Sequence, residues 1–270
     1  MSANTAQPVP PHTPLPVCSL MGMRLARVGQ AELVEHVFTT LAAGKGGWLL
    51  TANLDFLRRY VRDAKVRALY DAADLRVADG APLVWASRLQ GEALPERVAG
   101  SSLVWLLAEG AARDGRSLYL LGGTPAANEA AARILVERYP GLHICGRSCP
   151  PISSPPTADE VAHLQSELVA LQPHILLVAL GSPKQEQVIA SLRRHLPTTW
   201  MMGVGASLSF VAGELARAPV WMQRAGLEFL HRLVQEPGRL ARRYLVEDLP
   251  FALRLFPAAI TARLRARRSP

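Results

Sequence analysis

Cysteine is scarce in this chain, and its metal-binding residue types do not cluster. The three cysteines, Cys18, Cys145 and Cys149, form an odd set without the paired spacing of a zinc site. Free thiols in a reducing compartment are the simplest interpretation. No pair of aspartates at metal-ligand spacing follows a predicted strand either. The sequence therefore predicts neither a structural zinc site nor a metal-dependent reaction centre.

Long hydrophobic runs are also missing. A membrane-spanning helix needs about 20 apolar residues, whereas the apolar stretch 245–260 is interrupted by Glu247, Asp248 and Arg254. The first 16 residues contain five prolines and lack the basic start and apolar stretch of a signal peptide. We therefore expect a disordered arm over residues 1–16 and a chain that does not cross a bilayer.

A complete dinucleotide-binding fingerprint is absent as well. Gly122 and Gly123 follow one predicted strand, and Gly203 and Gly205 lie at the end of another. Backbone amides in such turns can cradle a phosphate. The fingerprint, however, requires its glycines after the first strand and an acidic residue about twenty positions later. The sequence gives little support for NAD, while phosphate binding at these two turns stays open.

Charge is abundant but unevenly distributed. The chain has a net charge of +8, and residues 217–270 contain eleven arginines against four acidic residues. Such a basic end can bind an anionic membrane surface, diphosphate groups or nucleic acid, or it can be a solvated face. Nucleic-acid binding would need aromatic residues between the arginines to stack bases. Trp221, Phe229 and Tyr244 lie instead on apolar faces or within the motifs described below, so no nucleic-acid partner is expected.

Short apolar runs alternate with helical patterns through most of the chain. Strands are predicted at residues 48–52, 75–78, 117–121, 142–145, 175–180 and 200–204. Helices are predicted at residues 30–41, 55–71, 81–89, 101–113, 126–139, 158–171 and 184–195. A hairpin is expected at 17–27, and a proline- and serine-rich loop at 148–157. This rhythm predicts an α/β fold, a Rossmann-like parallel sheet with helices on both faces.

The alternation stops after residue 204. Three helical segments follow, separated at Pro219, at residues 236–238 and at Pro250. The first two are amphipathic and cationic. We therefore predict an α/β catalytic core over residues 17–206 and a basic, C-terminal helical appendage over 207–270 that docks on a membrane.

The stretch VALGSPKQE, residues 178–186, is the most informative motif. An apolar run ends at Gly181, and Pro183 can open a helix whose free amides point at the same place. Lys184, Gln185 and Glu186 then supply a charge, an amide and a carboxylate. The pattern favours a polar ligand, although a generic strand, loop and helix would also contain it.

Three further residues stand where parallel strands end, which is where ligands bind in open α/β folds. Thr51 and Asn53 close the first of these strands, and Asp79 closes the second. Asp79 can act as a general base, but both Asn53 and Asp79 can equally be helix caps. Arg97 lies in a loop near the same edge, where it suits phosphate oxygens or is simply a solvated arginine.

In their order along the chain, these motifs resemble the WecG/TagA/CpsF glycosyltransferases, glycosyltransferase family 26. The likeness covers about residues 18–244. It is carried by Thr51-Ala-Asn53, VADGAPLVW, PERVAGSSL, LYLLGGTP, Pro150-Pro151, VALGSPKQE, GVGASLSFVAG and RAPVWMQRAGLEFLHRLVQEPGRLARRY. The resemblance implies transfer of a sugar from a UDP-sugar donor to an undecaprenyl-diphosphate-linked acceptor. It also implies inversion of the anomeric centre, with no metal and no cofactor.

Carried over residue by residue, the resemblance makes Asp79 the base that deprotonates the acceptor. Arg97, Gln185, Thr51 and Asn53 would share its pocket, and the arginines of the appendage would face the diphosphates. Those arginines are Arg232, Arg239 and Arg242. The enzyme would be cytoplasmic and peripheral, on the anionic inner face of the cell membrane, and a homo-oligomer is plausible.

One motif departs from the family pattern. Many members have phenylalanine and aspartate where this chain has Leu208 and Ser209. The donor could therefore be an N-acetylmannosamine type, its uronate or glucose, or the change could be a neutral core variation. A different class of function, a non-catalytic UDP-binding scaffold of a polysaccharide assembly complex, is the alternative hypothesis.

Overall fold

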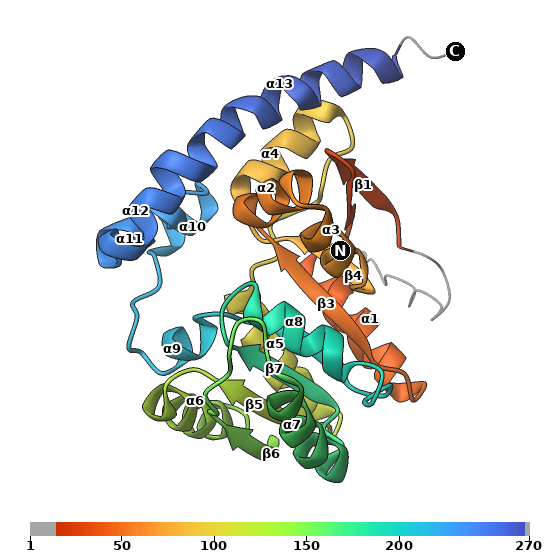
Figure 1. Ribbon diagram of the computed structural model, residues 1–270, viewed down its shortest axis with the longest axis vertical. Coiled ribbons are helices and arrows are strands. Elements are labelled where there is room, and N and C mark those ends of the chain that lie inside the picture. Colours follow the sequence, from red (N-terminus) through yellow and green to blue (C-terminus); the bar gives the residue numbers. More distant parts are fainter. Residues whose placement is uncertain (1–14, 268–270) are drawn as a thin grey trace, which may run out of the picture.

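A six-stranded parallel sheet forms the centre of the computed structural model, which describes residues 15–267 except for the side chains of Arg224 and Arg239. The strand order is β4-β3-β8-β7-β5-β6 (Figure 1). The strands are β3 (Gly47–Ala52), β4 (Leu75–Ala78), β5 (Ser117–Gly122), β6 (His143–Ser148), β7 (Ile175–Ala179) and β8 (Trp200–Gly203). An antiparallel hairpin of β1 (Val17–Leu20) and β2 (Met23–Ala26) packs beside β4. All six predicted strands and the hairpin are confirmed.

Helices cover both faces of this sheet, as the alternating pattern predicts. The sheet separates two hydrophobic clusters, and strand residues contribute to them in turn. In β7, Leu176 and Val178 belong to one cluster, and Ile175 and Leu177 belong to the other. A strand buried on both faces reads as a continuous apolar run, which is why the sequence predicts it well.

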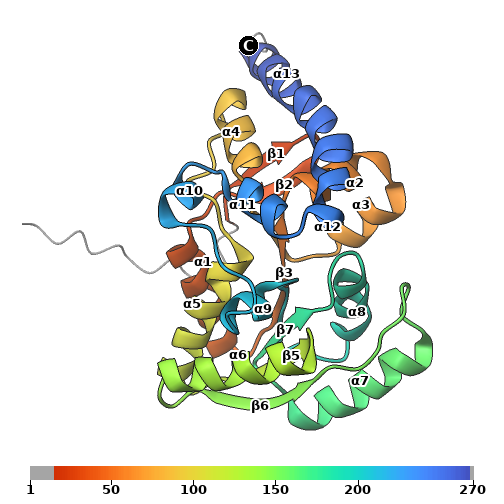
Figure 2. The same ribbon diagram turned by 90° about the vertical axis from the view of Figure 1, so that its left-hand side faces the viewer.

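The covering helices lie on opposite sides of the sheet in Figure 2. One cluster receives side chains of α1 (Gln30–Ala42), α5 (Gly100–Arg113) and α6 (Pro125–Arg138). The other receives side chains of α4 (Ala81–Gln90), α7 (Ala158–Leu171) and α8 (Lys184–Leu192). The predicted fold class, α/β with a parallel sheet between helical layers, is confirmed.

The single helix predicted at residues 55–71 is wrong. The chain forms α2 (Leu54–Arg62) and α3 (Ala64–Asp71), with Asp63 in an extended conformation between them. The Asp63 carboxylate accepts hydrogen bonds from the backbone N–H groups of Lys65 and Val66. A short acidic side chain thus competes with the helix backbone and starts a second helix.

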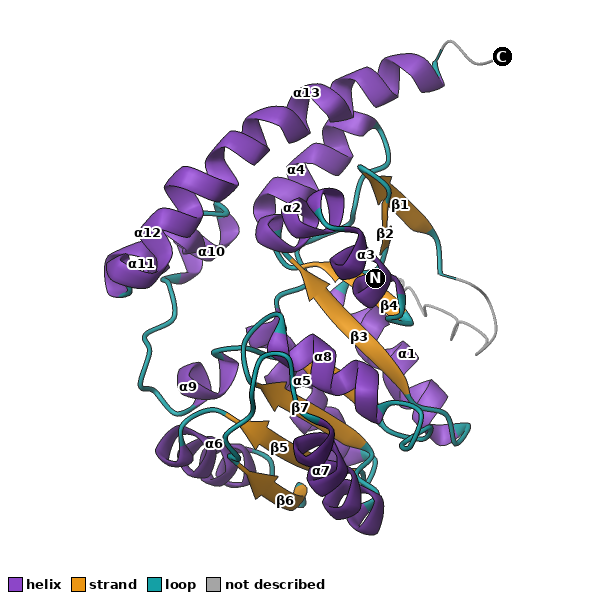
Figure 3. Cartoon of the chain, viewed as in Figure 1, coloured by secondary structure: helices purple, strands orange, loops and turns teal. Residues whose placement is uncertain are grey.

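The tail is helical, but it is divided differently from the prediction. Its elements are α9 (Ser207–Val211), α10 (Val220–Arg224), α11 (Glu228–Gln235), α12 (Pro237–Ala241), the π-helical η1 (Arg242–Asp248) and α13 (Leu249–Ala266). The predicted break at Pro250 is wrong, because α12, η1 and α13 run on continuously (Figure 3). The Leu249 N–H donates to the Tyr244 carbonyl, five residues earlier. Pro250 has no N–H to donate, and it interrupts one backbone hydrogen bond without ending the helix.

The last helix packs on the core. Phe251, Leu255 and Ala259 of α13 share a hydrophobic cluster with Leu83 and Ala86 of α4. The predicted division between residues 206 and 207 stays a prediction, and residues 1–14 of the predicted arm lie outside the described residues. Within residues 15–267, no helix has the length and hydropathy needed to cross a bilayer.

Candidate active site

Asp79 is held at the carboxyl end of β4. Its backbone N–H donates to the Ala52 carbonyl over 2.7 Å, and its Oδ2 accepts from the Gly100 N–H over 3.0 Å. A methyl group placed on Gly100 would lie 3.4 Å from Thr51 Oγ1 and 3.6 Å from Asp79 Oδ2. Thr51 and Asp79 therefore border the same small space at the start of α5. Asp79 does not cap α4, whose cap residue is Gly80, but its carboxylate accepts the first N–H of α5.

The surroundings of Asp79 favour a proton acceptor. Burial raises the pKa of Asp79 to about 6, although the Arg97 guanidinium and the Gly100 N–H act in the opposite direction. Glu228 adds to the rise, and Arg232 reduces it. A carboxylate with a pKa near 6 is ionised at neutral pH and still basic enough to take a proton.

Arg97 joins the core to the tail. Its loop runs along β4, where the Val98 N–H donates to the Ala78 carbonyl over 2.8 Å. The Arg97 Nη1 lies 2.5 Å from Glu228 Oε2, the first residue of α11, and the two side chains are 20% and 12% exposed. Arg97 is therefore not the solvated surface arginine of the alternative interpretation. Glu228 was not predicted, since nothing in the sequence pairs residues 131 positions apart.

Among the tail arginines predicted to face the diphosphates whose side chains the structure describes, Arg232 has a charge that acts on Asp79. Arg232 lies one helical turn after Glu228, stacks 5.5 Å over the Phe210 ring and lies 3.7 Å from Glu236. The Arg242 side chain is 86% exposed and lies 3.7 Å from Glu247. The Arg239 backbone lies in α12, but its side chain is outside the described part. A diphosphate role for all three stays a prediction.

Arg243, the neighbour of Arg242, turns toward the core instead. Its Nη2 donates to Asn53 Oδ1 over 3.2 Å. The same Oδ1 accepts from the backbone N–H groups of Asp55 and Phe56 at the start of α2. The helix-cap interpretation of Asn53 is therefore confirmed, while its predicted contact with substrate stays a prediction.

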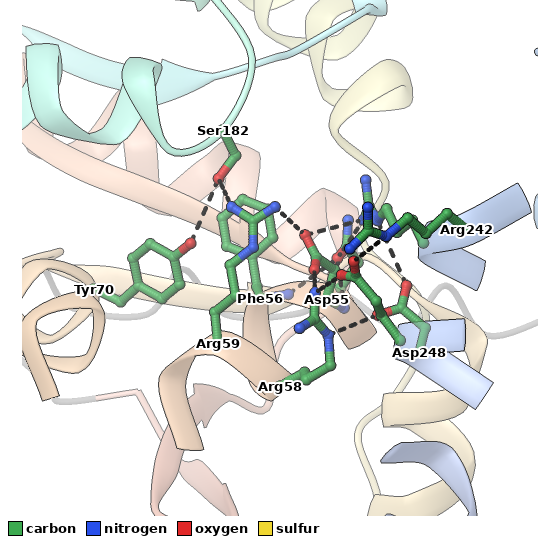
Figure 4. A network of polar contacts seen from close by, with 11 residues as sticks. Asp55, Phe56, Arg58, Arg59, Tyr70, Ser182, Arg242 and Asp248 are labelled. Atoms are coloured by element: carbon green, nitrogen blue, oxygen red, sulfur yellow. Dashed lines mark hydrogen bonds and ion pairs between the residues drawn. The ribbon is translucent and has the colours of Figure 1, made fainter. Parts of the chain in front are cut away.

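Arg243 belongs to a charged network between α2 and η1, shown in Figure 4. We call it the α2–η1 network, and its members are Asp55, Arg58, Arg59, Arg243, Glu247 and Asp248. Asp55 is 1% exposed and pairs with all three guanidiniums. Arg58 also reaches Glu247 over 2.6 Å and Asp248 over 3.2 Å. Three cations that are at least partly buried thus face three anions, and the exposed Arg242 lies at the edge of the network, 3.7 Å from Glu247. The sequence did not predict the network.

The residues of the VALGSPKQE motif are engaged within the protein. Gln185, 5% exposed, donates from Nε2 to Glu186 Oε1 over 2.7 Å and accepts the Gly205 N–H over 3.0 Å. Burial raises the pKa of Glu186, 1% exposed, to about 6. Lys184 Nζ donates to the Ile152 carbonyl over 2.6 Å. These side chains fix the loops at the strand ends, and their substrate contacts stay predictions.

The glycine turns are also tied to their neighbours. Gly122, Gly123, Gly181 and Gly205 all have positive φ angles, and Gly203 closes β8. The Gly123 N–H donates to the Ala179 carbonyl over 2.9 Å. Because the amides of Gly123 and Gly205 already have acceptors, a phosphate cradle at these turns stays a prediction.

No cluster of three or more His, Cys, Asp or Glu side chains suited to a metal ion occurs among residues 15–267. Near Asp79, the carboxylate of Glu228 acts on it within the described chain and is paired with Arg97. A metal-independent reaction stays a prediction.

Comparison with known proteins identifies the family. The model of the glycosyl transferase WecG/TagA/CpsF family matches residues 18–266, nearly the whole chain. The chain belongs to the WecG/TagA/CpsF family. A relative in Bacillus spizizenii, N-acetylglucosaminyldiphosphoundecaprenol N-acetyl-beta-D-mannosaminyltransferase, is 29% identical over 212 residues, which cover 78% of this chain and 80% of the relative. The predicted family and the predicted glycosyltransferase activity are confirmed.

Proposed function

We propose that this WecG/TagA/CpsF glycosyltransferase moves a hexose from a UDP-sugar to a saccharide linked to undecaprenyl diphosphate. Family membership supports the reaction type, and the name of the relative supports a lipid-diphosphate acceptor. The observation that carries the proposal is Asp79, a half-buried carboxylate of raised pKa at the strand edge, facing arginines from core and tail. The product would enter exopolysaccharide or cell-envelope glycan synthesis.

The proposed reaction is a single displacement. Asp79 takes the proton of the acceptor hydroxyl while that oxygen bonds to the anomeric carbon of the donor sugar. The bond from this carbon to the UDP oxygen breaks, and UDP leaves with the electron pair. Attack opposite the leaving group inverts the anomeric centre. The Gly100 N–H orients the base, and Arg97 and Arg232 supply positive charge for the leaving diphosphate without a metal.

The donor sugar is proposed to be an N-acetylmannosamine type, its uronate or glucose. Leu208, where many family members have phenylalanine, is 1% exposed and belongs to a core cluster. It lies beside Gly123, since a methyl group there would be 3.7 Å from Leu208 Cδ1. Ser209 follows it and is only partly buried. The variation at Leu208 is thus accommodated in the core, and a screen of UDP-sugars by mass spectrometry identifies the donor.

Attachment to the cytoplasmic face of the membrane is proposed from the outer side of η1 and α13. Val246, Leu249, Leu253, Ile260 and Leu264 recur at helical spacing and are at least 46% exposed. Arginines of the same helix accompany this apolar stripe. Such a helix lies in the plane of an anionic interface. Leu253→Glu should lower binding to anionic vesicles in sedimentation; unchanged binding would contradict this docking face.

The central test is turnover with radiolabelled UDP-sugars and a lipid-diphosphate-linked acceptor. Asp79→Asn keeps an oxygen that can accept from the Gly100 N–H, but it removes the base, so transfer should fall by about 10³-fold or more. Asp114→Asn, a surface change at the end of α5, is the matched control and should retain full activity. Retained transfer by Asp79→Asn would remove Asp79 from the mechanism. UDP binding without any transfer would favour the scaffold alternative.

A further inference from the structure

A cavity of about 450 Å³ lies between the core and the tail, next to Arg97. Its walls come from α4, the loop that ends at Ala99, the first turn of α5, and α10 with the turn that follows it. Figures 1 and 2 both show α10 beside α4. We call this space the α4–α10 cavity. None of Thr51, Asn53 and Asp79 lines it, so it is a neighbour of the base and not its immediate pocket.

The tail closes this cavity through a tight turn. Gly226 has a φ of +74°, and a methyl group there would lie 2.5 Å from the Ala81 Cβ and 2.9 Å from the Trp85 ring. Two residues later, Glu228 pairs with Arg97. The same turn therefore shapes the cavity and contacts the side chain that acts on Asp79.

Uncompensated positive charge distinguishes the cavity. It is lined by Arg88, Arg97 and Arg217, and only Arg97 has a carboxylate partner among residues 15–267. Arg217 donates from Nη2 to Ser102 Oγ over 2.8 Å, while its Nε is buried without an acceptor in the described part. Burying a donor of a charged group without an acceptor is costly. The pattern indicates that an anion completes the arrangement.

The one acidic residue of the described lining, Glu96, offsets only part of the charge of the three arginines. Glu96 Oε1 accepts the backbone N–H of Gln30 over 2.6 Å, at the start of α1. The opposite wall is apolar and includes Val84 and the half-exposed Trp85. An apolar wall with a few convergent polar groups is typical of a small-molecule site. A guanidinium fork matches phosphate oxygens in particular.

We propose that the α4–α10 cavity binds the diphosphate group of a substrate, with Arg217 and Arg88 as its ligands. The inference rests on the proposed function, in which both the UDP-sugar and the lipid-linked acceptor carry a diphosphate. Neither arginine belongs to the set that the sequence motifs assign to diphosphates. Their place beside Arg97 puts a bound diphosphate one side chain away from Asp79.

Calorimetric titration of the full chain tests the proposal with two probes, UDP and a short-chain polyprenyl-diphosphate N-acetylglucosamine. Arg217→Gln should weaken binding of one probe by about 10- to 100-fold, as expected for the loss of a charged hydrogen bond. Arg88 is exposed, so Arg88→Gln should weaken binding by about 3- to 10-fold and serves as a second variant that cannot disturb the core. Arg133→Gln on α6 is the matched control and should bind like the unmodified protein.

The probe that loses affinity identifies the source of the diphosphate. A loss for UDP alone assigns the cavity to the donor, a loss for the lipid probe alone assigns it to the acceptor, and a loss for both assigns it to a position that both groups contact. Unchanged affinity for both probes in both variants would overturn the proposal. Transfer by the unmodified protein is measured separately, so failure of the cavity assignment and failure of the proposed function are distinguishable.

Discussion

Arginines gather at two places where the tail meets the core, and their partners differ. In the α2–η1 network, Arg58, Arg59 and Arg243 each pair with buried or half-buried carboxylates. In the α4–α10 cavity, Arg88 and Arg217 form no ion pair with a carboxylate of residues 15–267. A basic tail therefore contains arginines of two kinds. Arginines that pair with carboxylates hold the tail on the core, and arginines without an ion pair are available to an anionic ligand.

Breaking the α2–η1 network should have the largest effect on stability. Arg58→Gln leaves Asp55, 1% exposed, and Asp248, 5% exposed, short of positive charge. Removing one partner of a buried ion pair costs about 3–5 kcal/mol, and denaturant unfolding measures it. Arg113→Gln breaks a surface pair and should cost less than about 1 kcal/mol. Equal losses of unfolding free energy in the two variants would show that an arginine of the α2–η1 network stabilises the protein no more than a surface arginine does.

The turn that closes the cavity should be nearly as sensitive. Gly226→Ala places a methyl group 2.5 Å from the Ala81 Cβ and also strains a positive φ, so we expect a loss of about 2–4 kcal/mol and weaker substrate binding. Gly213→Ala is a close control, because Gly213 has a φ of +77° but nothing within 4 Å. It should lose only about 1 kcal/mol. Similar losses would show that contact with α4 is unimportant.

Asp79 should lower stability at neutral pH while it serves catalysis. Its folded pKa of about 6 exceeds its ordinary value of 3.8, so the folded state binds the proton more tightly than the unfolded chain. The stability of the unmodified protein therefore decreases as the pH rises from about 4 to 6. Asp79→Asn does not titrate, so it should be more stable than the unmodified protein by about 1–3 kcal/mol at pH 7.5 but not at pH 4. Thermal unfolding at both pH values measures this. The value of kcat/KM should also decrease as the pH falls through about 6, because Asp79 is then protonated and cannot act as the base. A pH-independent difference would show that Asp79 titrates normally.

The smallest stability effect is expected in the cavity. Arg217→Gln removes a cation that no carboxylate in the described chain needs, so the free energy of unfolding should change by less than about 1 kcal/mol. Ligand affinity should change far more. If unfolding measurements show that Arg217→Gln loses as much stability as Arg58→Gln, then Arg217 holds the tail on the core as Arg58 does, and the two regions do not differ.

Local chemistry decides how much of this could be predicted from the sequence. The strands were predictable because neighbours such as Leu176 and Leu177, which are buried on opposite faces of the sheet, are both apolar. The break at Asp63 was missed because its carboxylate competes with the helix backbone. The ion pair of Arg97 and Glu228 was missed because no local pattern encodes a contact across 131 positions.

The orientation of the adjacent arginines Arg242 and Arg243 has a geometric cause. A regular α-helical spacing after residue 239 would place Arg242 on the same side of the helix as Arg239. In the wide turns of η1, Arg243 instead reaches Asn53 and Asp55, while Arg242 is 86% exposed. The π-helical stretch therefore decides which of two adjacent arginines meets the core, and sequence periodicity does not reveal it.

The same stretch sets the rotation of everything that follows it. Each residue advances an α-helix by about 100°, so the extra residue in a wide π-helical turn rotates the helix that follows about its own axis. With this rotation, Phe251 and Leu255 pack in the same hydrophobic cluster as α4, and Leu253 is exposed on the side where we propose that the membrane lies. A chain shortened by one residue within η1 would present the wrong side of its final helix to both surfaces at once.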